Sequence, residues 1–307
     1  MVSVSNLSHY LAGNSVIIEN NFDIPDNQVV GFLGPNGAGK TTTMRIITGY
    51  YPIMQGVVKV AGHDIATHSF EARSKLGYLP ETVPLYDDLT IFEYLSFMAS
   101  VMKVKNKDIK DHVNAICKKT GLKDVQNRLI KTVSRGYKQR VGIAQALIGD
   151  PQVLILDEPT VGLDPVQIKE IRDLIKSLAA SKTVILSTHI LPEVSQICSR
   201  VIIINQGKII ADGSVDNLIH GQHGNLHIRI TYNGDQTIDD VVSRFDCVKI
   251  VKGPFGVNDS KELVVEMSKD VRADLLKKLI QKDIHVIQYS SESANLEEIF
   301  VRLVTKE

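Results

Sequence analysis

The chain has 307 residues, of which 43% are hydrophobic and 23% are charged. The length leaves room for about two domains with proper cores, and the composition excludes a disordered or fibrous protein. Lys plus Arg equals Asp plus Glu at 35 each, so no net charge recruits nucleic acid or an anionic membrane, and we expect no nucleic-acid partner.

The N-terminal sequence does not predict a signal peptide. Residues 1–10 lack the cationic start and apolar core of a signal peptide. No segment approaches the about 18 uninterrupted apolar residues that cross a bilayer. The three cysteines have no paired spacing, which is typical of packing residues in a reducing cytosol. We therefore expect a soluble chain that reaches a membrane only through a partner.

Two kinds of strand are predicted. Short, more alternating runs predict a small antiparallel subsheet at residues 2–4, 16–19 and 57–60. Runs that are apolar throughout are typical of parallel strands buried on both faces, and they occur at residues 29–33, 153–156, 183–187 and 201–204. Apolar residues at three- and four-residue spacing between 168 and 178 predict a helix on that sheet. The pattern predicts an α/β fold.

A glycine-rich loop follows the first apolar strand. Gly34, Gly37 and Gly39 let the backbone curl so that successive N–H groups point at phosphate oxygens. Lys40 adds a cation for the terminal phosphates, and Thr41 offers a hydroxyl to Mg²⁺. The alternative is a turn that binds nothing, but the strand before the loop and the helix-like run after it favour a phosphate site.

A helical insertion is predicted between about residues 84 and 147, where strand signals disappear and three helix-like runs follow one another. The last run begins near Ser134 and Gly136, and helix N-termini bind anions, so we expect a second phosphate contact there. On its own, Ser134 as a simple N-cap explains the sequence at least as well. Its place just before an acidic strand end favours the phosphate contact.

Two carboxylates, Asp157 and Glu158, end the apolar strand at 153–156. Acids at a buried strand end are costly unless a cation or a substrate uses them. We expect Asp157 to hold Mg²⁺ through water and Glu158 to polarise an attacking water. The alternative, a strand end with solvated acids, is less favoured because a phosphate loop lies on the same chain.

Two later residues have competing explanations. Asp164 precedes Pro165, which makes a good N-cap and first helical turn, and this structural role stands level with a functional one. His189 ends the strand at 183–188. A lone histidine there is usually structural, yet ligands sit at the carboxyl ends of parallel strands, so a contact with the γ-phosphate is the functional alternative.

The pattern changes after about residue 220. Strand and helix signals then follow in the order of a split βαββαβ unit, the ferredoxin-like arrangement, with a final helix at about 296–303. The predicted elements are strand 226–232, helix 238–245, strand 248–251, strand 262–267, helix 271–280 and strand 285–289. We therefore expect a first domain at 1–220 and a small ferredoxin-like α+β domain at 221–307.

Residues 1–220 resemble the nucleotide-binding subunit of ATP-binding cassette (ABC) transporters. By this resemblance Asp157 and Glu158 are the Walker B pair and His189 is the switch histidine. The implied Walker A residues are Gly34, Pro35, Asn36, Gly37, Ala38, Gly39, Lys40, Thr41 and Thr42. The other implied positions are Tyr10 against adenine, Glu81 in the Q-loop, Ser134, Arg135, Gly136 and Tyr137 as the signature, and Asp164 in the D-loop. An ordinary surface tyrosine is the alternative for Tyr10.

The resemblance also implies a chemistry with ATP and Mg²⁺. Lys40, Glu158 and His189 serve hydrolysis, and the metal site consists of Thr41, Glu81 and Asp157. The family works as a head-to-tail homodimer, in which the Walker A loop of one subunit and the signature of the other hold each ATP. Closure is transmitted through the Q-loop and the helical insertion to an integral membrane permease. The implied location is cytoplasmic, peripheral on the cytoplasmic face of the cell membrane.

Two motifs depart from the family pattern. Glu81 replaces the usual glutamine, keeping an oxygen for Mg²⁺ but losing an amide donor. The usual Leu-Ser-Gly-Gly-Gln signature reads Val-Ser-Arg-Gly-Tyr, which retains Ser134 and Gly136. These variants and the appended domain resemble the exporter branch of multidrug, antibiotic and gliding-motility ATPases. The alternatives are a soluble cassette ATPase uncoupled from transport and a nucleotide-sensing module, and Glu158 with His189 argues against the second.

Overall fold

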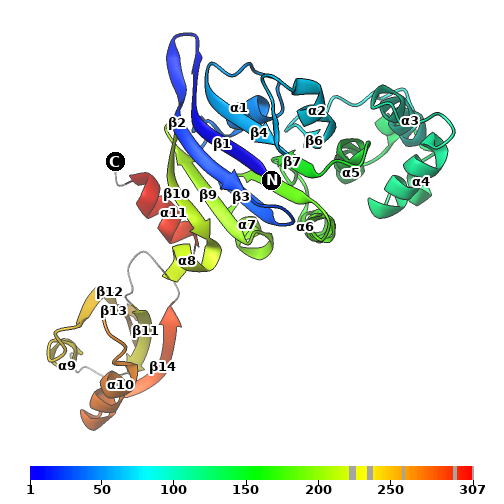
Figure 1. The fold of residues 1–307 in the computed structure, drawn as a ribbon. Helices are drawn as coiled ribbons and strands as arrows, with labels where there is room; N and C mark the ends of the chain where they lie inside the picture. Colours follow the sequence, from blue (N-terminus) through cyan, green and yellow to red (C-terminus); the bar gives the residue numbers. More distant parts are fainter. Residues whose placement is uncertain (221–225, 234–237, 258–259, 293–295, 306–307) are drawn as a thin grey trace. The chain divides into compact units, whose positions relative to one another are not determined.

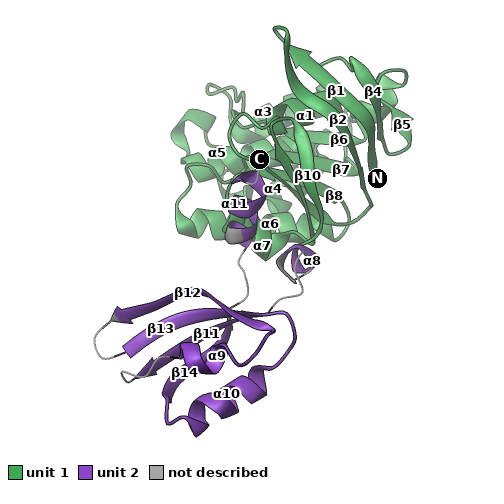
Figure 2. Cartoon of the chain, turned by 90° about the vertical axis from the view of Figure 1, so that its left-hand side faces the viewer, with its two compact units in different colours: residues 1–214 green, residues 215–307 purple. Residues whose placement is uncertain are grey.

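Figure 1 shows the computed structural model of the chain, which describes residues 1–220, 226–233, 238–257, 260–292 and 296–305. The chain divides into two units, Met1–Ser214 and Val215–Glu307 (Figure 2). The boundary expected at about residue 221 falls outside the described residues.

The central sheet of the first unit has six strands in the order β10-β9-β3-β8-β7-β6. Neighbouring strands run parallel except β10, which is antiparallel to β9. Every residue of β3, β7 and β8 is buried, as uninterrupted apolar runs predict. The strands are β3 (Val29–Leu33), β6 (Leu76–Leu79), β7 (Val153–Asp157), β8 (Thr183–Thr188), β9 (Arg200–Asn205) and β10 (Lys208–Ser214).

A helix follows each of three parallel strands. These are α1 (Lys40–Ile47) after β3, α6 (Pro165–Ala179) after β7 and α7 (Leu191–Ile197) after β8. The apolar stripe predicted between 168 and 178 is the buried face of α6. Since parallel strands end at one edge of a sheet, the loops that lead into these helices gather there.

The N-terminal sheet is antiparallel and has the order β2-β1-β4-β5. Its strands are β1 (Val2–Leu11), β2 (Asn14–Ile24), β4 (Gln55–Val60) and β5 (His63–Asp64), and α2 (Ser69–Ser74) follows. β1 and β2 are longer than predicted, because register shifts along β1 break the alternation from which strands are recognised. The antiparallel subsheet is confirmed.

The helical insertion contains α3 (Ile91–Val101), α4 (Ile109–Lys119) and α5 (Arg135–Leu147), with short 3-10 turns at Lys123–Val125 and Ile130–Thr132. α3 begins at a capping box, in which Thr90 and Glu93 exchange hydrogen bonds. α5 packs so closely on β6 that a Cβ on Gly77 would lie 1.9 Å from the Ala146 carbonyl oxygen. Figure 1 shows α3 and α4 beyond α5, away from the central sheet.

The second unit has an antiparallel sheet in the order β12-β13-β11-β14, which is the ferredoxin-like arrangement predicted from the sequence. Its apolar core lies between this sheet and two helices. The predicted helix at 238–245 is shorter, because only Asp239–Val242 is helical and a turn follows. The elements are α8 (Val215–His220), β11 (Leu226–Asn233), α9 (Asp239–Val242), β12 (Val248–Val257), β13 (Ser260–Met267), α10 (Arg272–Gln281), β14 (His285–Glu292) and α11 (Leu296–Thr305).

Within the described ranges, no helix combines the length and the apolar character that crossing a bilayer requires.

Candidate functional site

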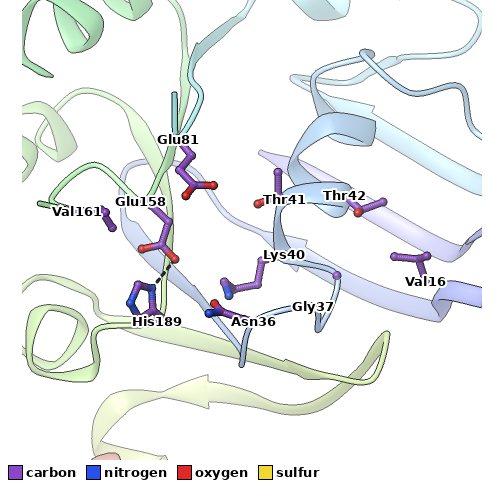
Figure 3. A pocket seen from close by; sticks show the side chains of 11 residues that line it. Val16, Asn36, Gly37, Lys40, Thr41, Thr42, Glu81, Glu158, Val161 and His189 are labelled. Carbon is purple, nitrogen blue, oxygen red and sulfur yellow. Dashed lines mark hydrogen bonds and ion pairs between the residues drawn. The ribbon is translucent and has the colours of Figure 1, made fainter. Parts of the chain in front are cut away.

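A pocket of about 490 Å³ lies where the parallel strands of the central sheet end (Figure 3). Glu81, Glu158, Val161 and His189 form one side. The other side is the loop after β3 with the start of α1, and Val16 of β2 lies at its far end. The loop residues that line the pocket are Asn36, Gly37, Gly39, Lys40, Thr41 and Thr42. Parallel topology thus brings together residues more than a hundred positions apart.

Lys40 is a buried cation at the first turn of α1. Its Nζ donates hydrogen bonds to the carbonyl oxygens of Gly34 at 2.8 Å and Pro35 at 3.2 Å. Burial lowers the pKa of Lys40, and the carboxylates on the opposite side of the pocket act against that shift. The ammonium group is therefore held over the loop, where an anion can replace the carbonyls as its partner.

The loop requires glycine at two points. A Cβ on Gly34 would lie 2.4 Å from the Ile204 carbonyl oxygen. Gly39, directly before α1, has a φ of 108°, in the region that favours glycine. These positions place a curled backbone against a helix N-terminus, which is the arrangement that binds phosphate groups.

Asp157 ends β7 and is fully buried. Neither carboxylate oxygen has a hydrogen bond of ordinary geometry. Burial raises the pKa of Asp157, and the nearby hydroxyls of Ser187 and Thr41 oppose that shift only in part. An unpaired buried carboxylate is unfavourable, so this position is suited to a cation.

The donor set fits Mg²⁺. In the described part of the chain, no group of three His, Cys, Asp or Glu side chains forms a complete metal cage. Mg²⁺ does not require one, because it keeps several waters and takes one or two carboxylates together with substrate phosphates. Asp157, Glu81 and the Thr41 hydroxyl provide suitable oxygens, with Glu81 and Thr41 on the pocket wall.

Glu158 is a buried carboxylate whose φ is 50°, an uncommon backbone conformation for a residue other than glycine. Its N–H donates to the Ser187 carbonyl at 2.8 Å, which holds this conformation. Its Oε1 lies 2.8 Å from Nδ1 of His189, and its Oε2 accepts from the Thr188 hydroxyl at 3.3 Å. Figure 3 shows the Glu158–His189 pair facing the pocket. Both carboxylate oxygens of Glu158, a candidate general base, are therefore held in position by neighbouring side chains.

Ser187 and Thr188 were not among the expected site residues. They end β8 directly before His189, and all residues of that strand are buried. Two hydroxyl residues that end an otherwise apolar strand, next to a histidine, were the signal available in the sequence. Val16 and Val161, which also line the pocket, carry no such signal.

Ser134, Gly136 and Tyr137, which are expected to belong to the signature, line a second pocket of about 290 Å³. This pocket shares no lining residue with the first. The Ser134 hydroxyl caps α5 by accepting from the Tyr137 N–H at 3.4 Å. Arg140 closes the pocket on one side, donating to the Thr120 carbonyl at 2.9 Å and to the Glu170 carboxylate at 2.7 Å. One chain therefore does not bring the phosphate loop and the signature together.

Two further expected residues lie outside the first pocket. Asp164 caps α6 by accepting from the N–H groups of Val166 at 3.0 Å and Gln167 at 2.9 Å. Tyr10 is an exposed residue of β1, with 47% of its surface accessible. The structural role of Asp164 is thus observed, and the adenine contact of Tyr10 stays a prediction.

Comparisons with known proteins agree with this geometry. The ABC transporter family model matches residues 18–161. An ABC transporter ATP-binding protein, YhcH of Bacillus subtilis, is 31% identical over 311 residues, covering 100% of this chain and 97% of its own. The bacitracin transport ATP-binding protein BcrA of Bacillus licheniformis is 30% identical over 306 residues, covering 99% and 97%.

A solved structure of an ATP-binding subunit of an ABC transporter is also similar. It superposes with a TM-score of 0.66 at 28% identity and covers 73% of this chain and 93% of its own. The architecture is thus a P-loop ABC ATPase domain with a small C-terminal domain. Since the two bacterial relatives match over nearly the whole of both chains, this chain belongs to the family of ABC transporter ATP-binding proteins.

Proposed function

We propose that this chain binds and hydrolyses ATP and that its hydrolysis energises transport, in the export direction, by a separate membrane permease. The observation that carries the proposal is the Glu158–His189 pair, which faces Lys40 across a pocket next to the unpaired carboxylate of Asp157. Relatives whose names state a function are bacitracin transport and linearmycin resistance proteins, which favours export.

Each residue has a role that its position permits. The loop N–H groups and Lys40 bind the phosphates, and Thr41, Asp157 and Glu81 hold Mg²⁺, which neutralises phosphate charge when bound. Glu158 accepts a proton from the attacking water. His189 keeps the Glu158 carboxylate in place through the 2.8 Å contact.

A second copy of the chain completes the site in this proposal. The phosphate pocket has its own donors on one side, whereas Ser134 and Gly136 lie in a separate pocket. Two chains arranged head to tail let the exposed N-terminus of α5 from one copy meet the nucleotide of the other. Ser134 is exposed and is therefore accessible to such a partner.

We place the permease contact in an apolar groove of about 310 Å³ between α2 and the end of α3. Its rim exposes Phe70 and Val101, whose surfaces are 62% and 56% accessible, and the Lys103 ammonium lies 4.8 Å from the centre of the Phe70 ring. This groove joins the central domain to the helical insertion, so a partner seated in it touches both parts. The proposed location is the cytoplasmic face of the cell membrane.

The experiment that tests the enzymatic part is phosphate release by the purified chain with ATP and Mg²⁺. Glu158→Gln should lower the rate by about 10²- to 10⁴-fold, as expected for loss of a general base. The matched control is Glu266→Gln in the second unit, which should leave the rate unchanged. A wild-type rate no higher than that of Glu158→Gln refutes the ATPase and favours a nucleotide-sensing module.

The transport part has a separate test. Phe70→Ser should reduce retention of the chain by membranes that contain its permease, while phosphate release by the free chain stays the same. Ile280→Ser removes a similarly exposed apolar side chain from the second unit and serves as the control. Equal retention of all three proteins places the permease contact elsewhere.

A further inference from the structure

The segment 159–164 lies between Glu158 and α6. It is held by hydrogen bonds to two side chains that come from other parts of the first unit. Glu193 of α7 holds Thr160, and Arg135 at the start of α5 holds Val161. α7 follows His189, whereas α5 carries the signature. The segment thus connects two elements whose roles in the proposed reaction differ.

The attachment at Thr160 is a buried one. Glu193 is 3% exposed and Thr160 is 2% exposed, and the Thr160 hydroxyl donates to Oε2 of Glu193 at 2.7 Å. Oε1 of Glu193 has no hydrogen-bond partner among the described residues. Burial raises the pKa of this carboxyl. A poorly paired buried acid weakens the fold, so the contact of Glu193 with Thr160, two residues after Glu158, requires another explanation.

The attachment at Val161 is a surface one. Nη2 of Arg135 donates to the Val161 carbonyl at 2.9 Å. The guanidinium group lies against Gly162, where an added Cβ would be 2.3 Å from Cζ of Arg135. Gly162 has a φ of 74°, a conformation that favours glycine, and an added Cβ would displace the Arg135 guanidinium group from its place beside the segment. The next attachment is the Asp164 cap on α6.

We propose that Glu193 and Arg135 are positioning residues that fix the segment 159–164. They thereby keep the distance and orientation between the Glu158–His189 pair and the signature of the same chain constant. This inference rests on the proposed function. In a head-to-tail dimer, the Glu158–His189 pair acts at one nucleotide and the signature of the same chain at the other. Glu193 and Arg135 therefore couple the two sites through a single chain.

The first test compares Glu193→Ala with Glu193→Gln. The alanine variant loses the acceptor for Thr160 and should lower kcat about tenfold, with the KM for ATP changed by less than about twofold, because binding of the phosphates is untouched. The glutamine variant keeps an acceptor oxygen and should restore most of kcat. Asp88→Asn, on an exposed carboxylate, is the control.

The second test adds Arg135→Ala, with Arg135→Lys as the conservative variant and Arg128→Ala, at an exposed arginine before α5, as the control. Arg135→Ala should lower kcat about three- to tenfold, and the double variant with Glu193→Ala should lose less than the product of the single losses, because both act on one segment. Should Glu193→Ala fail to fold, Thr160→Val against Thr160→Ser asks the same question.

Hydrogen exchange of the purified chain without nucleotide separates this inference from the proposed function. Amides between residues 160 and 163 should exchange faster in Glu193→Ala and Arg135→Ala than in wild type, whether or not the chain hydrolyses ATP. Unchanged exchange, or a kcat in Glu193→Gln as low as in Glu193→Ala, overturns the inference. Absence of wild-type hydrolysis together with faster exchange overturns only the proposed function.

Discussion

The two units of this chain differ in how their central sheets place acidic side chains. In the first unit, parallel strands deliver Asp157 and Glu158 to one buried edge, and both oxygens of Asp157 lack ordinary hydrogen bonds. In the second unit, Arg229 of β11 forms an ion pair at 2.7 Å with Glu262 of the neighbouring antiparallel strand β13, diagonally across the ladder, and both side chains are about 40% exposed.

This difference follows from topology. Parallel strands end at the same edge, so their last residues and the loops after them meet there. In the antiparallel sheet, polar residues of neighbouring strands pair along one face and stay solvated. A buried acid without a partner in the first unit therefore indicates a ligand, whereas the exposed ion pairs of the second unit indicate a solvated surface.

Among the variants that test this comparison, Lys40→Ala is expected to have the largest effect, which is a loss of ATP affinity. Lys40→Ala removes a charge-assisted contact worth about 1.5–3 kcal/mol, so ATP should bind about ten- to a hundredfold more weakly. Equilibrium titration with ATP measures it. The control is Lys131→Ala, an exposed lysine paired with Asp88. Unchanged affinity in Lys40→Ala contradicts the role assigned to this cation.

Asp157→Asn tests the same comparison through the stability of the first unit. Without nucleotide or Mg²⁺, removal of the buried charge should raise the free energy of unfolding of the first unit by about 1–2 kcal/mol, since that carboxylate lacks a partner. Denaturant titration measures this change. Added Mg²⁺ and ATP should stabilise wild type more than the variant. A loss of stability without ligand would mean that Asp157 is already satisfied by the protein.

The smallest effect is expected in the second unit. Glu262→Gln breaks the exposed pair with Arg229, and the free energy of unfolding should fall by less than about 1 kcal/mol. Because the pair is solvated, raising the salt concentration should reduce the difference. The same denaturant titration reports it, and a loss above that limit would show that the two units do not differ in this respect.

The sequence predicted the elements well where local pattern decides them. The apolar strands, the phosphate loop, the helical insertion and the ferredoxin-like order all have periodic or compositional signals that need no partner. The lengths of β1 and β2 were wrong because register shifts disturb the alternation. The helix near 238 was too long because its last residues form a turn.

Contacts between distant residues were not predictable from the same signals. The bond from Thr188 to Glu158 and that from Thr160 to Glu193 join residues 30 and 33 positions apart. Arg135 was expected only as part of the signature, yet its guanidinium group contacts Val161 in its own chain. Such pairs depend on which strands lie side by side and on how α7 and α5 pack on the sheet, which no single run of residues encodes.

The central claim is that each nucleotide site is shared between two chains, and a mixing experiment tests it most directly. Lys40→Ala disables the phosphate loop, and Ser134→Arg blocks the signature at an exposed position. At ATP concentrations near the wild-type Kd, where Lys40→Ala binds little nucleotide, each variant alone should release little phosphate. Mixed in equal amounts, half of the dimers are hybrids with one intact site, so about a quarter of wild-type phosphate release should return. A mixture no more active than either variant alone contradicts a shared site.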